Sequence, residues 1–196
     1  DPLPAAPTTA QAVNAARGDE KKTAKFAILA VRPKAETEAR WKSLIDYLNR
    51  ATPEKPLELL ALTYPELESA IREKRVDFVL TQPAHYIALT QREGLLSPLA
   101  SLIETQDGKP VTALAGLILT RSDHKTIQSL GDLAGKRIAA SSVTSLGSYQ
   151  AQAYELQLRG INLATDATVI ETGQPQDLAI EQLLAGKVDV AFVRTG

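Results

Sequence analysis

The sequence predicts an α/β protein in which parallel strands alternate with helices in two successive lobes. Short apolar runs of about six residues recur along the chain, and segments with apolar side chains at helical spacing follow them. This alternation starts afresh after Arg121-Ser122-Asp123. Because strands joined through helices run parallel, in sheets covered on both faces, each half of the chain should bury its own sheet.

Three segments follow from this organisation. Residues 1–23 have little apolar periodicity and are expected to form a tail or linker, although part of Thr8–Ala16 also fits a short helix. Residues 24–121 should form lobe 1, and residues 122–196 should form lobe 2. A chain of 196 residues is long enough for two such lobes or for one large domain.

Lobe 1 opens with the compact apolar run Phe26–Val31, which predicts a buried strand. A helix with Thr37 as its cap is expected over Thr37–Arg50, where apolar residues have helical spacing. The same reasoning predicts strands at 57–62 and 76–80 and helices at 65–74 and 83–93, the last with Pro83 in its first turn and Gly94 after its end. Residues 95–103 and 113–120 are further strand candidates, separated by a turn at 107–110 and expected to pair antiparallel.

Lobe 2 repeats the pattern. Strands are expected at 137–140, 167–171 and 188–193, and helices at 146–159 and 176–184. The helix end and Val-Asp strand entry around Val76-Asp77 parallel those around Val188-Asp189. Shared βα patterning would explain this likeness, and so would two similar lobes facing each other across a cleft, where ligands collect at the carboxyl ends of strands. The two aspartates are interpreted as structural.

Composition excludes several function classes. The chain has no cysteine, so disulfides, thiolate nucleophiles and Cys-ligated metals are excluded, and its two histidines are too few for a His-rich metal site. A net charge of -1, from 22 basic and 23 acidic residues, offers no general attraction for nucleic acid or anionic lipid. We find no Ser/His/Asp set and no nucleotide-binding fingerprint, so no catalytic residue is assigned and no cofactor is expected.

The turn from Ser141 to Ser148 is the main candidate site. Small hydroxyl residues and Gly147 lie there between a buried strand and an amphipathic helix. Backbone N–H groups at a helix start, together with hydroxyl donors, can hold an anion without a formal positive charge. An N-cap with ordinary turn residues is the alternative. The predicted ligand residues of this turn are Ser141, Thr144, Ser145, Gly147 and Ser148.

Further candidates follow the other predicted strands. Arg32 and Arg194 each come after a buried strand, where a guanidinium can grip an oxyanion or instead pair with a carboxylate. Polar or aromatic groups that could orient a ligand are Thr81, Gln82, Tyr86, Gly173 and Gln174. His85 is expected at the surface or as a cap.

Several of these segments resemble type II periplasmic solute-binding proteins, in particular the phosphonate/phosphite-binding family and related histidine-kinase sensor domains. The resemblance rests on Val76–Tyr86, on Ser129–Ala139 with its S-x-x-D-L-x-G-K pattern, on Ser141–Tyr149 and on Gly173-Gln174. These segments occur in the family's order between Phe26 and Gly196.

The resemblance implies an α/β two-lobed periplasmic-binding-protein type II fold. Family members continue beyond the position of Gly196 and cross back to lobe 1, so the fold is expected to be truncated before that return. It also implies a periplasmic, non-enzymatic domain, external to the inner membrane, that binds a small anion resembling a phosphonate, a phosphate or a sulfur oxyanion. The expected partner is a membrane-linked histidine kinase, through which the chain would form a homodimer, and the alternative is an ABC permease. An enzyme on a similar scaffold and a purely structural domain are the remaining alternatives.

Overall fold

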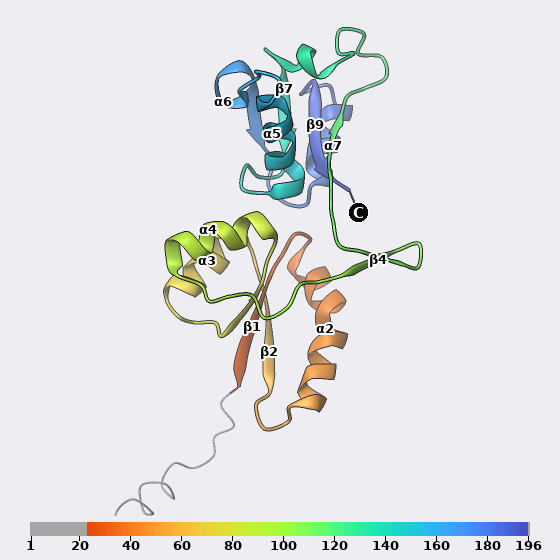
Figure 1. Cartoon of the computed structure of the whole chain (residues 1–196). Helices are drawn as coiled ribbons and strands as arrows, with labels where there is room; N and C mark the ends of the chain where they lie inside the picture. The colour runs from red at the N-terminus through yellow and green to blue at the C-terminus, as the bar shows by residue number, and fades with distance from the viewer. Residues whose placement is uncertain (1–22, 196) are drawn as a thin grey trace, which may run out of the picture.

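The computed structural model describes residues 23–195, which form two lobes, each built on its own sheet (Figure 1). The predicted tail of residues 1–23, with its short helix, lies outside the described residues except for Thr23. The strand order is β2-β1-β3 in the first sheet and β6-β9-β7-β8 in the second, so the described chain passes from one sheet to the other once. The connecting segment carries a two-stranded hairpin that projects from the lobes (Figure 1).

Lobe 1 has a parallel three-stranded sheet with helices packed against it. Apolar residues of β1 and α3 form its centre, and Ala27 and Leu67 are fully buried. The strands are β1 (Ala24–Leu29), β2 (Leu57–Leu62) and β3 (Phe78–Leu80). The helices are α2 (Lys34–Ala51), α3 (Tyr64–Arg72) and α4 (Pro83–Glu93). These elements match the predicted ones closely because each carries strong periodicity and a local end signal, such as the left-handed Gly94 after α4.

Lobe 2 has a mixed sheet covered on both faces. Ile138 and Ala140 of β7 face the cluster that includes Leu156, whereas Ala139 between them faces the cluster that includes Leu183. This alternation is the two-residue period of a strand buried on both sides. The strands are β6 (Gly116–Leu119), β7 (Arg137–Ala140), β8 (Thr168–Glu171) and β9 (Val190–Arg194). The helical elements are η1 (Leu130–Leu133), η2 (Leu146–Gln150), α5 (Ala151–Gln157), α6 (Leu163–Asp166) and α7 (Asp177–Leu184).

The two sheets share a core arrangement, which accounts for the repeat in the sequence. β1 and β7 are flanked in parallel by β2 and β3 and by β8 and β9, respectively. Asp77 accepts a hydrogen bond from the backbone N–H of Lys25 at 2.8 Å, and Asp189 accepts one from that of Arg137 at 2.9 Å. Both aspartates therefore tie a strand entry to the start of the neighbouring strand, as their structural interpretation requires.

The boundary between the lobes differs from the predicted division at residues 121 and 122. β6 pairs antiparallel with β9, with Gly116 opposite Arg194, and so belongs to the second sheet. The prediction placed β6 in lobe 1 because the βα alternation restarts only after Asp123. Strand partners far apart in sequence leave no local signal of this kind.

The predicted pairing of residues 95–103 with residues 113–120 is wrong. Residues 95–103 form no strand, and Leu96 and Leu99 are 88% and 87% exposed. Pro98 lies inside this run and has no N–H for a strand ladder. The hairpin is formed instead by β4 (Glu104–Gln106) and β5 (Lys109–Val111), around the predicted turn residues Asp107 and Gly108.

Two smaller expectations are also corrected. α2 begins at Lys34 after Pro33, so Thr37 is not its cap but a buried residue of its first turns, with Oγ1 donating to the carbonyl of Arg32 at 3.3 Å. Pro33 is the N-cap residue, and its carbonyl accepts a hydrogen bond from the backbone N–H of Thr37 at 2.9 Å. His85 is fully buried rather than at the surface.

Candidate functional site

The carboxyl ends of strands from both lobes meet where the lobes touch. The segments after β1 and β3 of lobe 1 contact the segments after β7 and β8 of lobe 2, through side chains 62 to 145 residues apart in sequence. The beginning of α4 lies toward lobe 2 in this arrangement (Figure 1). Parallel sheets bind ligands at this end, because helix N-termini and irregular loops expose polar groups there.

Gln82 is the main link between the lobes. Its Nε2 donates to the backbone carbonyl of Thr144 at 2.9 Å, and its Oε1 accepts from the backbone N–H of Leu146 at 3.4 Å. The same Oε1 accepts from Ala84 N–H at 3.0 Å, which makes Gln82 the N-cap of α4. Gln82 therefore ties the start of α4 to the Ser141–Ser148 turn.

Arg32 provides a second link. Its guanidinium forms an ion pair with the carboxylate of Asp177, the first residue of α7 in lobe 2. The two side chains are 39% and 51% exposed, so water screens much of their attraction. Of the two roles that the sequence left open for Arg32, this structure shows the pairing with a carboxylate.

The Ser141–Ser148 turn is held by its own hydroxyl groups. Ser141 and Ser148 are both 2% exposed, and their Oγ atoms are 2.6 Å apart. The Oγ of Ser145 caps the turn by accepting from Ser148 N–H at 3.3 Å, and Ser142 Oγ lies 2.9 Å from Thr144 Oγ1. The structure brings all five predicted residues of the turn together, with Ser141 and Ser148 committed to each other inside it.

Acceptor oxygens of the protein occupy several N–H groups of this turn. A carboxylate oxygen of Glu171 accepts from Val143 N–H at 3.0 Å, Ser142 Oγ accepts from Thr144 N–H at 3.2 Å, and Gln82 takes Leu146 N–H. The sequence predicted free N–H groups here. Glu171 instead shows that the turn can hold a carboxylate, since an anionic oxygen already lies on one of its amides.

Gly147 allows close packing behind the turn. A Cβ at this position would lie 2.6 Å from Cβ of Arg194 and 2.8 Å from Cδ1 of Leu114, so only glycine fits there without displacement. The backbone N–H of Arg194 donates to Gln176 Oε1 at 2.9 Å. Within residues 23–195, no carboxylate lies within ion-pair distance of the Arg194 guanidinium. Arg194 thus places a cationic residue beside Gly147 of the turn.

Gly173 and Gln174 close the turn from the β8 side. The backbone N–H of Gly173 donates to the carbonyl of Ser141 at 3.0 Å, and Gln174 Nε2 lies 3.4 Å from Ser141 Oγ. Gly173 has φ of 78°, a conformation that suits glycine. Both residues therefore lie against Ser141, at the predicted site.

The hydroxyl groups of Thr81 and Tyr86 form hydrogen bonds within lobe 1. Thr81 Oγ1 is 2.8 Å from Nδ1 of His85, and the Tyr86 hydroxyl donates to the carbonyl of Leu96 at 3.3 Å. Thr81 adjoins Gln82 at the junction, whereas Tyr86 supports the segment after α4. The structure therefore does not bring the Tyr86 hydroxyl to the other predicted groups.

Tyr64 is a residue of this junction that the sequence analysis missed. Its hydroxyl is buried and has no hydrogen-bond partner within the described residues. Burial raises the pKa of Tyr64, and the neighbouring side chains of Gln82 and Thr144 lower it in part. A buried donor without a partner is rare and suggests a ligand or water at that point. Tyr64 follows β2 as Arg32 follows β1 and Thr81 follows β3, and this shared position is the signal that could have identified it.

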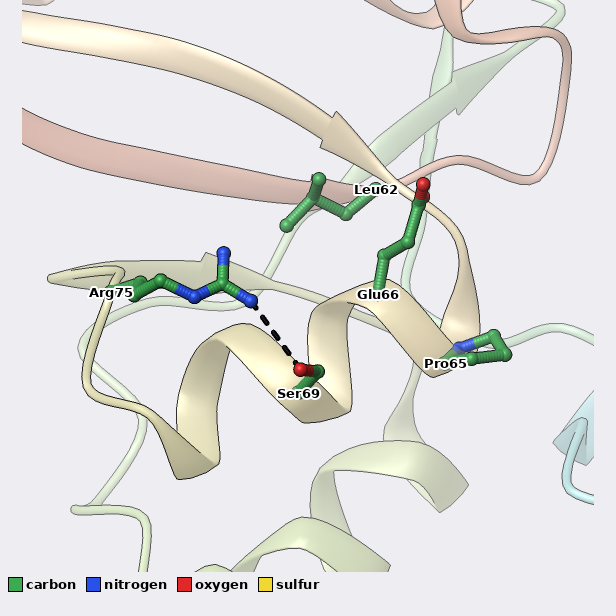
Figure 2. Close-up of a pocket in the computed structure, with 5 residues that line it drawn as sticks. All are labelled: Leu62, Pro65, Glu66, Ser69 and Arg75. Carbon is green, nitrogen blue, oxygen red and sulfur yellow. Dashed lines mark hydrogen bonds between the residues drawn. The ribbon is translucent and has the colours of Figure 1, made fainter.

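Elsewhere in the described residues, the features that could bind a ligand are weaker. A depression beside α3 is lined by Leu62, Pro65, Glu66, Ser69 and Arg75 (Figure 2). Its charged groups are engaged locally, since Arg75 Nη2 donates to Ser69 Oγ at 3.4 Å and Glu66 pairs with Lys34. Across residues 23–195, no three His, Asp or Glu side chains form a metal-binding group. No helix of that range is long and apolar enough to span a bilayer.

Comparison with known proteins agrees with this geometry. The chain is 32% identical over 167 residues to the tetrathionate sensor histidine kinase of Salmonella typhimurium, a match that covers 85% of this chain and 28% of the kinase. Among solved structures, a binding protein component of an ABC phosphonate transporter from Pseudomonas aeruginosa has a TM-score of 0.68 at 13% identity, over 88% of this chain and 57% of that one. PhnD1 of Prochlorococcus marinus, in complex with methylphosphonate, has a TM-score of 0.67 at 15% identity, over 89% and 64% of the two chains.

These matches confirm the predicted α/β type II periplasmic-binding-protein fold. The chain spans 28% of the kinase and 57% and 64% of the two solved proteins. A family model described as the periplasmic substrate-binding protein of phosphonate ABC transporters matches residues 26–196. The chain therefore belongs to the phosphonate-binding family of periplasmic substrate-binding proteins.

Proposed function

We propose that the chain is the ligand-sensing domain of an extracytoplasmic receptor, which binds a small anionic solute between its lobes and signals to a membrane-linked histidine kinase. One observation carries this proposal: the strand ends of both lobes converge, and Gln82 joins them through the hydroxyl-rich turn. The likeness to the tetrathionate sensor kinase supports the signalling role.

The polar groups at the junction suit an anion. The Tyr64 hydroxyl of lobe 1 and the Arg194 guanidinium of lobe 2 are donors. Two further donors, Val143 N–H and the Arg32 guanidinium, already donate hydrogen bonds to the carboxylates of Glu171 and Asp177, respectively. An incoming oxyanion can replace either carboxylate as the acceptor of these hydrogen bonds. The number of hydrogen bonds then changes little, so the exchange costs little free energy.

Such an exchange can produce a signal. Arg32 belongs to lobe 1 and Asp177 to lobe 2, so a ligand that takes over Arg32 changes a contact between the lobes. A ligand shifts the equilibrium between lobe arrangements only by its difference in affinity for them. Groups from both lobes supply that difference, because they surround the ligand in one arrangement alone.

Isothermal titration calorimetry with a panel of anions tests the binding step. The panel consists of tetrathionate, methylphosphonate, methanesulfonate, phosphate and acetate, titrated into the protein and into its Thr144→Ala and Ser145→Ala variants. We expect at least one sulfur or phosphorus oxyanion to bind and both variants to weaken it about fivefold, the equivalent of one hydrogen bond. Ser69→Ala, in α3, is the matched control and should bind as the unmodified protein does. Absence of binding by every anion would contradict the proposal.

A second candidate function is the solute-binding component of an ABC transporter. The description of the family and the transporter proteins among the solved structures favour it. The same interlobe site and the same anion would serve this role, so binding data do not separate the two functions. The gene sequence distinguishes the two functions. A membrane helix and a kinase encoded after Gly196 would indicate the sensor, and a separate permease gene would indicate the transporter.

A further inference from the structure

His85 lies inside lobe 1 behind the interlobe junction and is fully shielded from solvent. Nδ1 of its ring is 2.8 Å from Thr81 Oγ1, and Nε2 is 3.2 Å from Glu68 Oε1. Its ring meets that of Tyr64 edge-on, with the centroids 4.8 Å apart. Two of its three neighbours, Thr81 and Tyr64, thus belong to the strand ends that meet lobe 2.

The surroundings of His85 decide its tautomer. Glu68 Oε1 also accepts from Arg92 Nη2 at 3.1 Å, and an ionised carboxylate can only accept hydrogen bonds. Nε2 must therefore carry a proton and donate a hydrogen bond to Glu68 Oε1. In the neutral ring Nδ1 is then bare, and it accepts a hydrogen bond from the Thr81 hydroxyl. The single proton of Thr81 is used inside lobe 1, so this hydroxyl can offer a ligand only lone pairs.

We propose that His85 is a positioning residue whose charge state decides whether Thr81 accepts or donates hydrogen bonds at the interlobe site. When His85 gains a proton, Nδ1–H donates to Thr81 Oγ1, and the Thr81 proton turns outward, where an anion accepts it. No heavy atom has to move, because both ring nitrogens keep their partners. The inference rests on the proposed function for its ligand. It predicts that the protein takes up one proton, at His85, when an anion binds.

The direction of the pH effect follows from the neighbours of His85. Burial lowers the pKa of His85, Glu68 raises it in smaller measure, and Arg92 lowers it further. Tyr64, the remaining titratable neighbour, has a raised pKa and stays uncharged. The ring is therefore neutral at neutral pH in the free protein. An anion that accepts from Thr81 raises the pKa of His85, so anion affinity increases as the pH falls from the bound-state pKa to the free-state pKa.

Nitrogen-15 NMR of the histidine side chains tests the tautomer of His85 without any ligand. His85 and His124 are the two histidines of the chain, and a His124→Gln variant assigns the signals. We expect His85 at neutral pH to carry its proton on Nε2, with the chemical shift of a bare, hydrogen-bond-accepting nitrogen at Nδ1. A proton on Nδ1 in the neutral ring, or a ring already charged at neutral pH, would overturn the proposal.

Calorimetry between about pH 5 and pH 8 tests the coupling. The probes are tetrathionate and methanesulfonate, because their charges are constant over this range. The affinity of the bound probe should rise by up to about tenfold per pH unit on acidification, the limit for one proton taken up. Thr81→Val keeps the shape of Thr81 without its hydroxyl and should abolish this slope, whereas Thr90→Val, an exposed position on α4, should retain it.

An unchanged slope in Thr81→Val would refute the coupling. If no anion of the panel binds at any pH, the proposed function fails on its own. The tautomer of His85 still decides in that case whether this residue orients Thr81.

Discussion

Nε2 of Gln82, at the end of β3, donates a hydrogen bond across the lobe junction to the backbone carbonyl of Thr144, 2.9 Å away. The same side chain caps α4 through Ala84 N–H. Gln82 therefore both caps α4 and links lobe 1 to lobe 2. Substitutions can separate the two tasks, because a short capping side chain cannot reach lobe 2.

Gln82→Ser should keep the cap of α4 and lose the contact with lobe 2. We expect anion affinity to fall about fivefold, for the loss of about 1 kcal/mol of hydrogen bonding, with little change in melting temperature. Calorimetry and thermal unfolding measure the two effects. Gln91→Ser, at an exposed position of α4, should leave affinity unchanged, and an equal loss of affinity there would argue against the interlobe role of Gln82.

Asp177→Asn should free the Arg32 guanidinium for an anion. Because the pair is partly exposed, its removal should change the free energy of unfolding by less than about 1 kcal/mol. Anion affinity should rise severalfold, and Arg32→Gln should cancel this gain in the double variant. A double-mutant cycle in calorimetry measures the coupling, and additive effects of the two substitutions would show that Arg32 does not reach the ligand.

Gly116→Ala should destabilise lobe 2. A Cβ at this position would lie 2.4 to 2.5 Å from the side-chain amide of Gln152, which is 2% exposed and whose Nε2 donates to carbonyls of Leu117, Gly147 and Val193. We expect a loss of about 1 to 3 kcal/mol of unfolding free energy in urea denaturation, typical of overpacking. Gly131→Ala, where the nearest atom lies at 3.6 Å, should stay within about 0.5 kcal/mol of the unmodified protein.

Asp189→Asn should destabilise the protein in a pH-dependent way. The ion pair with the Arg137 guanidinium lowers the pKa of Asp189 to about 2, so this carboxylate stabilises the fold above its unfolded-state pKa of about 4. That contribution, about 2 kcal/mol, disappears as the pH falls from about 4 to about 2. Urea denaturation at pH values on both sides of this range measures it.

Asp77→Asn is the matched control in lobe 1, since Asp77 makes the equivalent bond to a strand start but no ion pair with a guanidinium within the described residues. Its effect on unfolding free energy should be smaller than that of Asp189→Asn. Equal losses at neutral pH would show that the backbone contact, and not the arginine, determines the stabilisation.

The secondary structure of both lobes could be predicted because its signals are local. β2 and β7 match the predicted residues, since each is a short apolar run bounded by polar or turn residues. The Ser141–Ser148 turn was also identifiable, because five hydroxyl residues between a strand and a helix form a local pattern. The repeated Val-Asp strand entries fitted two similar lobes as well as shared βα patterning, and the two sheets do share their parallel core.

Only the tertiary structure shows the contacts between residues far apart in the sequence. The sequence could not show that β6 pairs with β9, that Arg32 meets Asp177, or that Glu171 lies on the turn. His85 was misplaced for the same reason, since its buried ring has its hydrogen-bond partner Glu68 on another helix. Periodicity reports which face of an element is buried, whereas the polar partners across a lobe boundary exist only after the chain has folded.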